Sequence, residues 1–140
     1  MKIILICIAL TFVSPACRHD CLVLPEPTVF ELVNTNGENV ITNGTLPFSD
    51  ILINRVDGND TLTGMQYNLT NDNKVAVKEL GWYTGTTNYK FWTPDTTFYF
   101  SVQSSKFNSP KCDNTYRIDN VKFTNITGSK ETDFYKITIK

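Results

Sequence analysis

Residues 97–102, Thr-Phe-Tyr-Phe-Ser-Val, indicate the fold class of this 140-residue chain most clearly. Phe98, Phe100 and Val102 occupy every second position, and a threonine, a tyrosine and a serine stand before and between them. Successive side chains of a β-strand point to opposite faces of the sheet. The alternation therefore predicts a strand with one face buried and the other in water.

The same period of two recurs along the chain after residue 28. Turn signals rich in Asn, Asp and Gly, such as Asn36-Gly37 and Asp57-Gly58, separate the repeats. We expect about eight to ten short strands in a single antiparallel β-sandwich, immunoglobulin-like or transthyretin-like, over residues 28–140. The expected strands cover 28–33, 39–41, 50–56, 65–69, 74–80, 97–102, 115–119, 121–124 and 135–140.

Composition narrows the possible functions. The chain carries 13 Lys+Arg against 14 Asp+Glu, and 41% of its residues are hydrophobic. A core is therefore expected, whereas a nucleic-acid partner is not, because it would need a basic surface. The one histidine, His19, precedes the expected domain, which argues against histidine-based catalysis and against most zinc sites. We expect no cofactor and no metal site.

The first residues have the pattern of a signal peptide. Lys2 precedes an apolar run over residues 3–13, which is too short to cross a bilayer core of about 30 Å as a helix. Small residues then lead to Cys17. We predict a signal peptide over residues 1–16 and a tether over residues 17–27, whose Pro25 and Pro27 favour extended backbone.

The Ser-Pro-Ala-Cys sequence at residues 14–17 resembles the end of a bacterial lipoprotein signal. In such signals the cysteine becomes the first residue of the mature protein and is acylated, so the resemblance implies a lipid on Cys17 and a membrane partner. The alternative is ordinary secretion, with Cys17 as the first residue of a soluble protein.

The number of cysteines that remain after the leader predicts a disulfide. Cys7 leaves with the signal peptide, and acylation of Cys17 would leave an even pair, Cys21 and Cys112. In an oxidising compartment these two are expected to form a disulfide. Two alternatives remain: Cys17 pairs with one of them and carries no lipid, or both stay free thiols.

A longer resemblance begins in the first expected strand. Residues 30–41 read Phe-Glu-Leu-Val-Asn-Thr-Asn-Gly-Glu-Asn-Val-Ile, followed by Asn-Gly-Thr at 43–45 and Asp-Ile-Leu-Ile at 50–53. This stretch resembles the opening of small lipoproteins of Bacteroidetes-type bacteria, whose function is mostly unassigned. The resemblance implies a cell-envelope location, at the outer membrane, and supplies no catalytic or binding residue.

One segment has the character of a ligand site. Trp82, Tyr83, Tyr89 and Trp92 lie close together in the sequence, and flat rings on a sheet can stack on sugars or bury a partner's side chains. The alternative is that these rings fill the core and cover its end. Carboxylates for a glycosidase-like reaction are available, but most lie on turns or in the tether, and no pair of them stands out.

These observations rank three functions. The first is a cell-envelope lipoprotein whose β-sandwich is a non-catalytic binding or structural accessory module, with a carbohydrate or another envelope protein as partner. The second is a carbohydrate-binding envelope protein that uses the aromatic segment. The third is a small secreted hydrolase with paired carboxylates.

Overall fold

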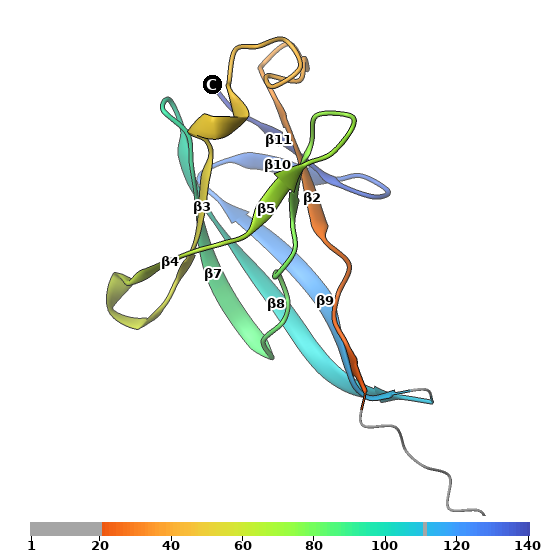
Figure 1. Cartoon of the computed structure of the whole chain (residues 1–140). Helices are drawn as coiled ribbons and strands as arrows, with labels where there is room; N and C mark the ends of the chain where they lie inside the picture. Colours follow the sequence, from red (N-terminus) through yellow and green to blue (C-terminus); the bar gives the residue numbers. More distant parts are fainter. Residues whose placement is uncertain (1–20, 111) are drawn as a thin grey trace, which may run out of the picture.

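The computed structural model describes residues 21–110 and 112–140 (Figure 1). The expected signal peptide, Cys17 and His19 lie outside the described residues. The described chain forms two sheets and two short 3-10 helices, η1 (Phe48–Asp50) and η2 (Gly58–Asp60). The first sheet runs, in spatial order, β1 (Leu22–Val23), β9 (Cys112–Thr124), β8 (Thr97–Ser109), β7 (Gly85–Trp92), β3 (Leu52–Val56) and β4 (Leu62–Gly64). The second runs β10 (Thr127–Lys130), β11 (Tyr135–Thr138), β2 (Thr28–Val33), β6 (Val75–Val77) and β5 (Tyr67–Leu69).

Both sheets are mixed rather than purely antiparallel. Strand β1 pairs with β9 in parallel, and β11 pairs with β2 in parallel. The expected β fold is confirmed, but the expectation of purely antiparallel pairing is wrong. Alternating hydrophobicity shows which face of a strand is buried, and it is the same for either direction of the neighbouring strand.

The two sheets share one core. Phe30 of β2 lies against Phe91 and Phe100 of the first sheet, with ring centroids 6.4 and 5.3 Å apart. Phe98, Phe100 and Val102, whose alternation predicted a strand, are at most 1% exposed. Aromatic burial of this kind is a large apolar contribution to folding, and it holds the sheets together in a sandwich-like arrangement.

The expected strand at residues 39–41 is absent, and the chain turns there after a single bridge from Val33 to Asn39. The Asn39 side chain explains the turn, because its Oδ1 accepts hydrogen bonds from the backbone N–H groups of Ile41 and Thr42. Strand β7, in contrast, lay within the aromatic segment and was not expected as a strand.

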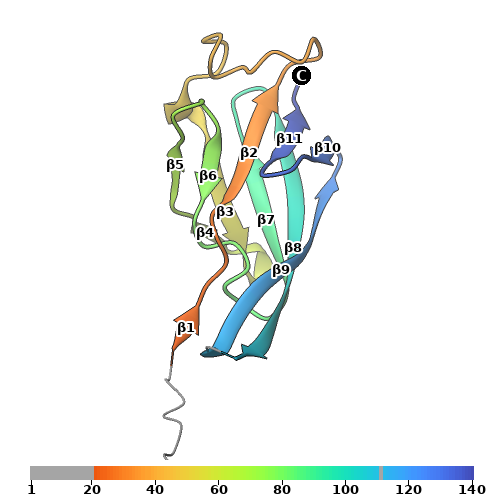
Figure 2. The same cartoon turned by 90° about the vertical axis from the view of Figure 1, so that its right-hand side faces the viewer.

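The β8–β9 hairpin runs the length of the molecule and extends beyond the second sheet (Figure 2). Each of its strands has 13 residues; at about 3.3 Å per residue, each spans about 40 Å. Beside it, Gly81 packs so closely between Ile118 and Pro25 that a Cβ atom would lie 2.5 Å from Ile118 Cγ1. This contact joins the loop before β7 to both β9 and the N-terminal segment.

Candidate functional site

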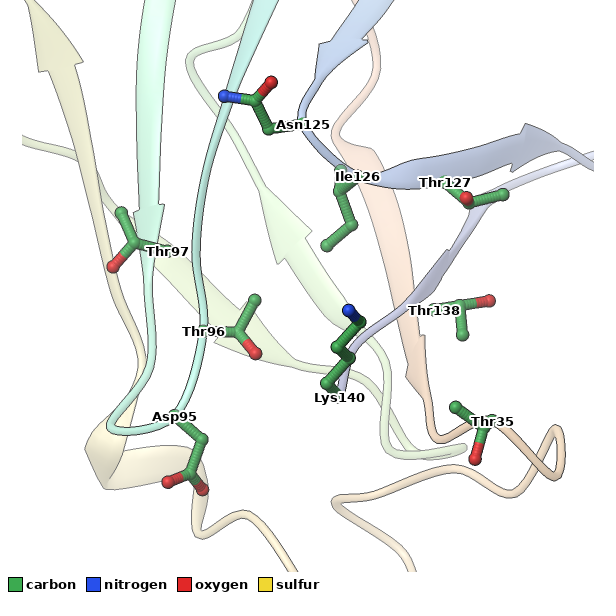
Figure 3. Close-up of a pocket in the computed structure, with 9 residues that line it drawn as sticks. All are labelled: Thr35, Asp95, Thr96, Thr97, Asn125, Ile126, Thr127, Thr138 and Lys140. Atoms are coloured by element: carbon green, nitrogen blue, oxygen red, sulfur yellow. The ribbon is translucent and has the colours of Figure 1, made fainter.

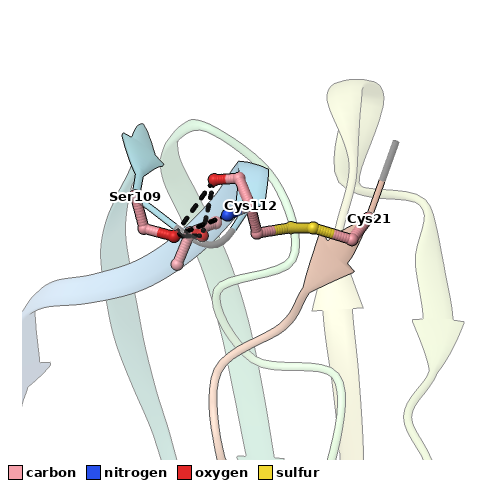
Figure 4. Close-up of a disulfide and its surroundings, with 4 residues drawn as sticks. Cys21, Ser109 and Cys112 are labelled. Carbon is pink, nitrogen blue, oxygen red and sulfur yellow. Dashed lines mark hydrogen bonds between the residues drawn. A yellow bond between two sulfur atoms is a disulfide. The ribbon is translucent and has the colours of Figure 1, made fainter. Parts of the chain in front are cut away.

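A disulfide fixes one end of the hairpin. Cys21 is bonded to Cys112, which lies 91 positions later in the chain, as the sequence predicted (Figure 4). Ser109 supports the bend beside it, because its hydroxyl accepts a hydrogen bond from the Cys112 N–H at 3.0 Å and donates one to the Cys112 carbonyl at 3.1 Å. The N-terminal segment is therefore covalently tied to the tip of the β8–β9 hairpin.

A cleft of about 680 Å³, lined mainly by residues with polar side chains, lies at the opposite end of the same hairpin (Figure 3). Strand β8 begins at Thr97 in the cleft and ends at Ser109 beside the disulfide, and β9 runs back from Cys112 to the cleft, where Asn125 follows it. We call it the threonine cleft. Its lining residues are Thr35, Asp95, Thr96, Thr97, Asn125, Ile126, Thr127, Thr138 and Lys140.

The threonine cleft offers hydrogen bonds without a dominant charge. Five of the described lining residues are threonines, and they are accompanied by one acid, Asp95, and one base, Lys140. Each threonine hydroxyl can donate and accept, while its methyl group supplies a small apolar contact. A neutral ligand or a polar peptide segment matches this lining better than a strongly charged one does.

One wall of the cleft is held by a tight turn. The Thr93 N–H donates to the Thr96 carbonyl at 2.8 Å, and the Thr96 N–H donates to Thr93 Oγ1 at 3.0 Å. Thr93 itself is buried, whereas Asp95 is exposed at the tip. The turn therefore presents Asp95 on a fixed backbone.

The four aromatic residues singled out in the sequence do not share one surface. Tyr89 is fully buried and points into the core, so a role for its ring on an exposed surface is wrong. Trp92 is half-buried in the same strand, and it faces the other side because it lies an odd number of residues away. Trp82 and Tyr83 precede β7; Trp82 is half-buried and Tyr83 is 51% exposed. Ligand binding by Trp82, Tyr83 or Trp92 stays a prediction.

Two carboxylates have clearly altered acidities. Hydrogen bonds from Arg55 and then from Thr63 lower the pKa of Asp57. Those from Lys74 and then from Thr70 lower the pKa of Asp72. A general acid needs a raised pKa, so neither group is suited to donate a proton at neutral pH.

The described residues contain neither a candidate metal site nor a candidate membrane-spanning helix. Within residues 21–110 and 112–140, no three His, Cys, Asp or Glu side chains are grouped so that they could hold a metal ion. In that same part of the chain, no helix has the length and hydropathy to cross a bilayer.

Comparison with known proteins identifies no relative. No protein-family model, no curated protein and no solved structure matches this chain. A functional proposal therefore depends on the geometry of the molecule itself.

The threonine cleft could not be found from the sequence. Its residues come from five separate places between Thr35 and Lys140, and no local motif links them. The only hint is compositional, since the chain contains 19 threonines, and threonine is also simply a good strand residue.

Proposed function

We propose that this chain is a cell-envelope lipoprotein whose β-sandwich is a non-catalytic module that binds a partner at the threonine cleft. Residues 1–16 direct export, and a lipid on Cys17 anchors the protein to the outer membrane. The observation that carries the proposal is the Cys21–Cys112 disulfide at the end of the hairpin opposite the cleft.

The disulfide limits how far the domain can lie from its anchor. Cys17 precedes Cys21 by four residues, and four residues span at most about 14 Å even when fully extended. Cys21 is bonded to the hairpin tip, so a lipid on Cys17 would hold that tip next to the membrane surface. The cleft would then lie about 40 Å further out, at the other end of β8.

Two further features support export and binding. Disulfides persist mainly in oxidising compartments outside the cytosol, which agrees with a leader that carries the chain across a membrane. A hydroxyl-rich cleft held by a rigid turn on a sandwich is suited to recognition, because its donors and acceptors are already in place before a partner arrives. Two packed sheets with a common core support a sandwich of the immunoglobulin-like or transthyretin-like kind, with one parallel pair in each sheet.

The anchor can be tested with two cysteine variants of the full chain. The wild-type protein, expressed in a diderm bacterium, is expected to incorporate an alkyne fatty acid and to enter the detergent phase of a Triton X-114 extract. Cys17→Ser removes the acylation site and should move the protein to the aqueous phase without label. Cys7→Ser, within the expected leader, is the matched control and should behave as the wild type does.

The opposite result is equally clear. Unlabelled wild-type protein found wholly in the aqueous phase would exclude the lipid anchor and leave plain secretion. Label that survives Cys17→Ser would place the lipid on another residue.

A further inference from the structure

A second, smaller hollow lies on the first sheet, away from the threonine cleft. Arg55 and Asp57 at the end of β3, Tyr83 before β7 and Thr87 on β7 line an open groove of about 210 Å³. We call it the Arg55 groove. Pockets that take drug-sized ligands measure about 300 Å³ or more, so this smaller groove has room for a single ring-sized unit.

The charged groups of the groove neutralise each other. Arg55 Nε lies 2.7 Å from Asp57 Oδ1, and Arg55 Nη2 donates to Asp57 Oδ2 at 3.2 Å, which makes a two-pronged ion pair. Thr63 donates a further hydrogen bond to Asp57 Oδ2 at 2.7 Å. The side chains of Arg55 and Asp57 remain 24% and 37% exposed. The pair therefore presents donors and acceptors to solvent while carrying no net charge.

The Tyr83 ring is positioned in advance. The Arg55 guanidinium lies 5.0 Å from the centre of the ring, in cation–π contact. The Ser104 hydroxyl donates a hydrogen bond to the Tyr83 carbonyl, which holds the backbone of the loop to β8. The residue is nevertheless 51% exposed, so part of a held aromatic surface stays open. A ligand that stacks there would not have to order it first.

These features select a class of ligand by elimination. A cation or an anion gains little, because Arg55 and Asp57 already satisfy each other's charge. A purely apolar ligand would cover polar groups without hydrogen-bonding them, which is costly. A neutral molecule with both an apolar C–H face and a row of hydroxyl groups meets the ring and the polar atoms together.

We propose that the Arg55 groove binds one neutral sugar unit, either a chain end or a side branch of a glycan. The apolar face of the pyranose ring lies on Tyr83, and neighbouring hydroxyl groups bond to the Arg55–Asp57 pair and to the Thr87 hydroxyl. This inference goes beyond the binding role proposed above, and it requires neither the lipid anchor nor the threonine cleft.

Saturation-transfer difference NMR on the purified, disulfide-bonded protein tests the proposal. The probes are methyl glycosides of glucose, mannose, galactose, xylose and N-acetylglucosamine at about 10 mM, a concentration that populates complexes of millimolar affinity. At least one glycoside should show transfer of saturation from the protein to its ring C–H protons. Tyr83→Ala should weaken that binding at least about tenfold, and Thr87→Val, which keeps the side-chain shape, should weaken it by a few-fold.

The matched control is Tyr99→Ala. Tyr99 is 43% exposed, and it lies on the face of β8 opposite the buried Phe98 and Phe100, so its removal should leave glycoside binding unchanged. Thermal melting and near-ultraviolet circular dichroism check that each variant is folded; if Tyr83→Ala is not, Thr87→Val decides. Absence of transfer to every glycoside, or binding that survives the groove variants, would overturn the proposal. Detergent partitioning of Cys17→Ser tests the anchor separately.

Discussion

At the scale of single residues, Tyr89 shows how a side chain can serve the core and still carry an energetic cost. Its ring stacks on Phe100 with centroids 5.1 Å apart, and the residue is fully buried. Its hydroxyl oxygen is buried as well; Thr87 and the Gly81 backbone lie near it and partly offset the effect of burial on its pKa, but neither makes a hydrogen bond of normal geometry with it. Burial raises the pKa of Tyr89 to about 12. The ring therefore stabilises the core, whereas burial of the hydroxyl destabilises the folded state and must be offset by other contacts.

Replacing Tyr89 by phenylalanine keeps the ring and removes the hydroxyl. Because an unsatisfied buried polar group costs about 1–3 kcal/mol, Tyr89→Phe is expected to increase the free energy of unfolding at pH 7 by about 1 kcal/mol. Urea unfolding of both proteins measures the difference. Tyr99→Phe, at an exposed position, is the control and should change the free energy by less than about 0.5 kcal/mol.

The same variant gives a pH dependence of known sign. Below pH 10 the tyrosine is protonated in both the folded and the unfolded chain, so it contributes no slope. Between the unfolded pKa of 10.0 and the folded pKa of about 12, only the unfolded chain releases the proton, and stability falls as the pH rises. We expect Tyr89 to account for a loss of up to about 1.4 kcal/mol per pH unit in this window. Equal slopes for the wild type and Tyr89→Phe between pH 10 and 12 would contradict this assignment.

At the scale of elements, the sequence predicted the strands better than it predicted their pairing. Ile118 and Val121 both belong to the partly buried apolar face of β9, yet they are three residues apart where strict alternation requires two. The register explains the break, because Gln103 pairs with Asn120 and Ser104 pairs with Ile118, which leaves Asp119 as the extra residue of a β-bulge. The interrupted alternation at residues 115–124 thus marks a bulge within one long strand, and the prediction of two short strands at 115–119 and 121–124 is wrong.

Parallel pairing left no such trace in the sequence. Strand β11 follows β10 in a hairpin and then lies beside β2, more than a hundred residues earlier in the chain. Which strands become neighbours depends on the path of the whole chain. A strand buries one face in the same way whether its neighbour is parallel or antiparallel, so the hydrophobic pattern does not reveal the direction of pairing. The disulfide was predictable for a different reason: if the expected leader removes Cys7 and the expected lipid occupies Cys17, only Cys21 and Cys112 are left to pair.

The smallest strand depends on that disulfide. Strand β1 has only two residues, and their side chains, Leu22 and Val23, are 61% and 46% exposed, so they bury little apolar surface against β9. Exchange of Cys21 and Cys112 for serine is expected to release β1 and to lower the free energy of unfolding by about 2–4 kcal/mol, the usual range for a native disulfide. Denaturant unfolding measures the free energy, and hydrogen exchange locates the change.

Hydrogen exchange should distinguish the release of β1 alone from a loss of stability throughout the domain. Amide protection is expected to fall at Leu22 and Val23 and to persist at residues 98–102 in the centre of β8, where the side chains of Phe98, Phe100 and Val102 are buried. Each single serine variant should match the double variant, because either one removes the same bond. Full protection of Leu22 and Val23 in the double variant would show that β1 holds without the disulfide. All variants carry Cys17→Ser, so that no other cysteine can replace the lost partner.

At the scale of the whole molecule, the arrangement of the two ends is what the sequence could not reveal. Residues that line the threonine cleft are spread along the described chain from Thr35 to Lys140, and only the complete fold brings them together. The Cys21–Cys112 bond and the cleft lie at opposite ends of β8, as the starting and final residues of that strand show. The β8–β9 hairpin therefore separates the threonine cleft from the disulfide end, where the proposed anchor would be attached.

Together with the proposed lipid on Cys17, this separation predicts how the protein is oriented on a bilayer. A fluorescent amino acid is placed either at Asn108, beside the disulfide end of β8, or at Asp95, on the exposed turn of the threonine cleft. In vesicles that contain lipids with spin-labelled headgroups, the probe at position 108 should be strongly quenched and the probe at position 95 hardly at all, because about 40 Å of strand separates the two positions. Non-acylated Cys17→Ser protein with either probe is the control and should show no quenching. Equal quenching at both positions would mean that the domain lies flat on the membrane. Stronger quenching at position 95 would mean that the cleft faces the bilayer. Either result would contradict the proposal that the cleft is presented away from the membrane.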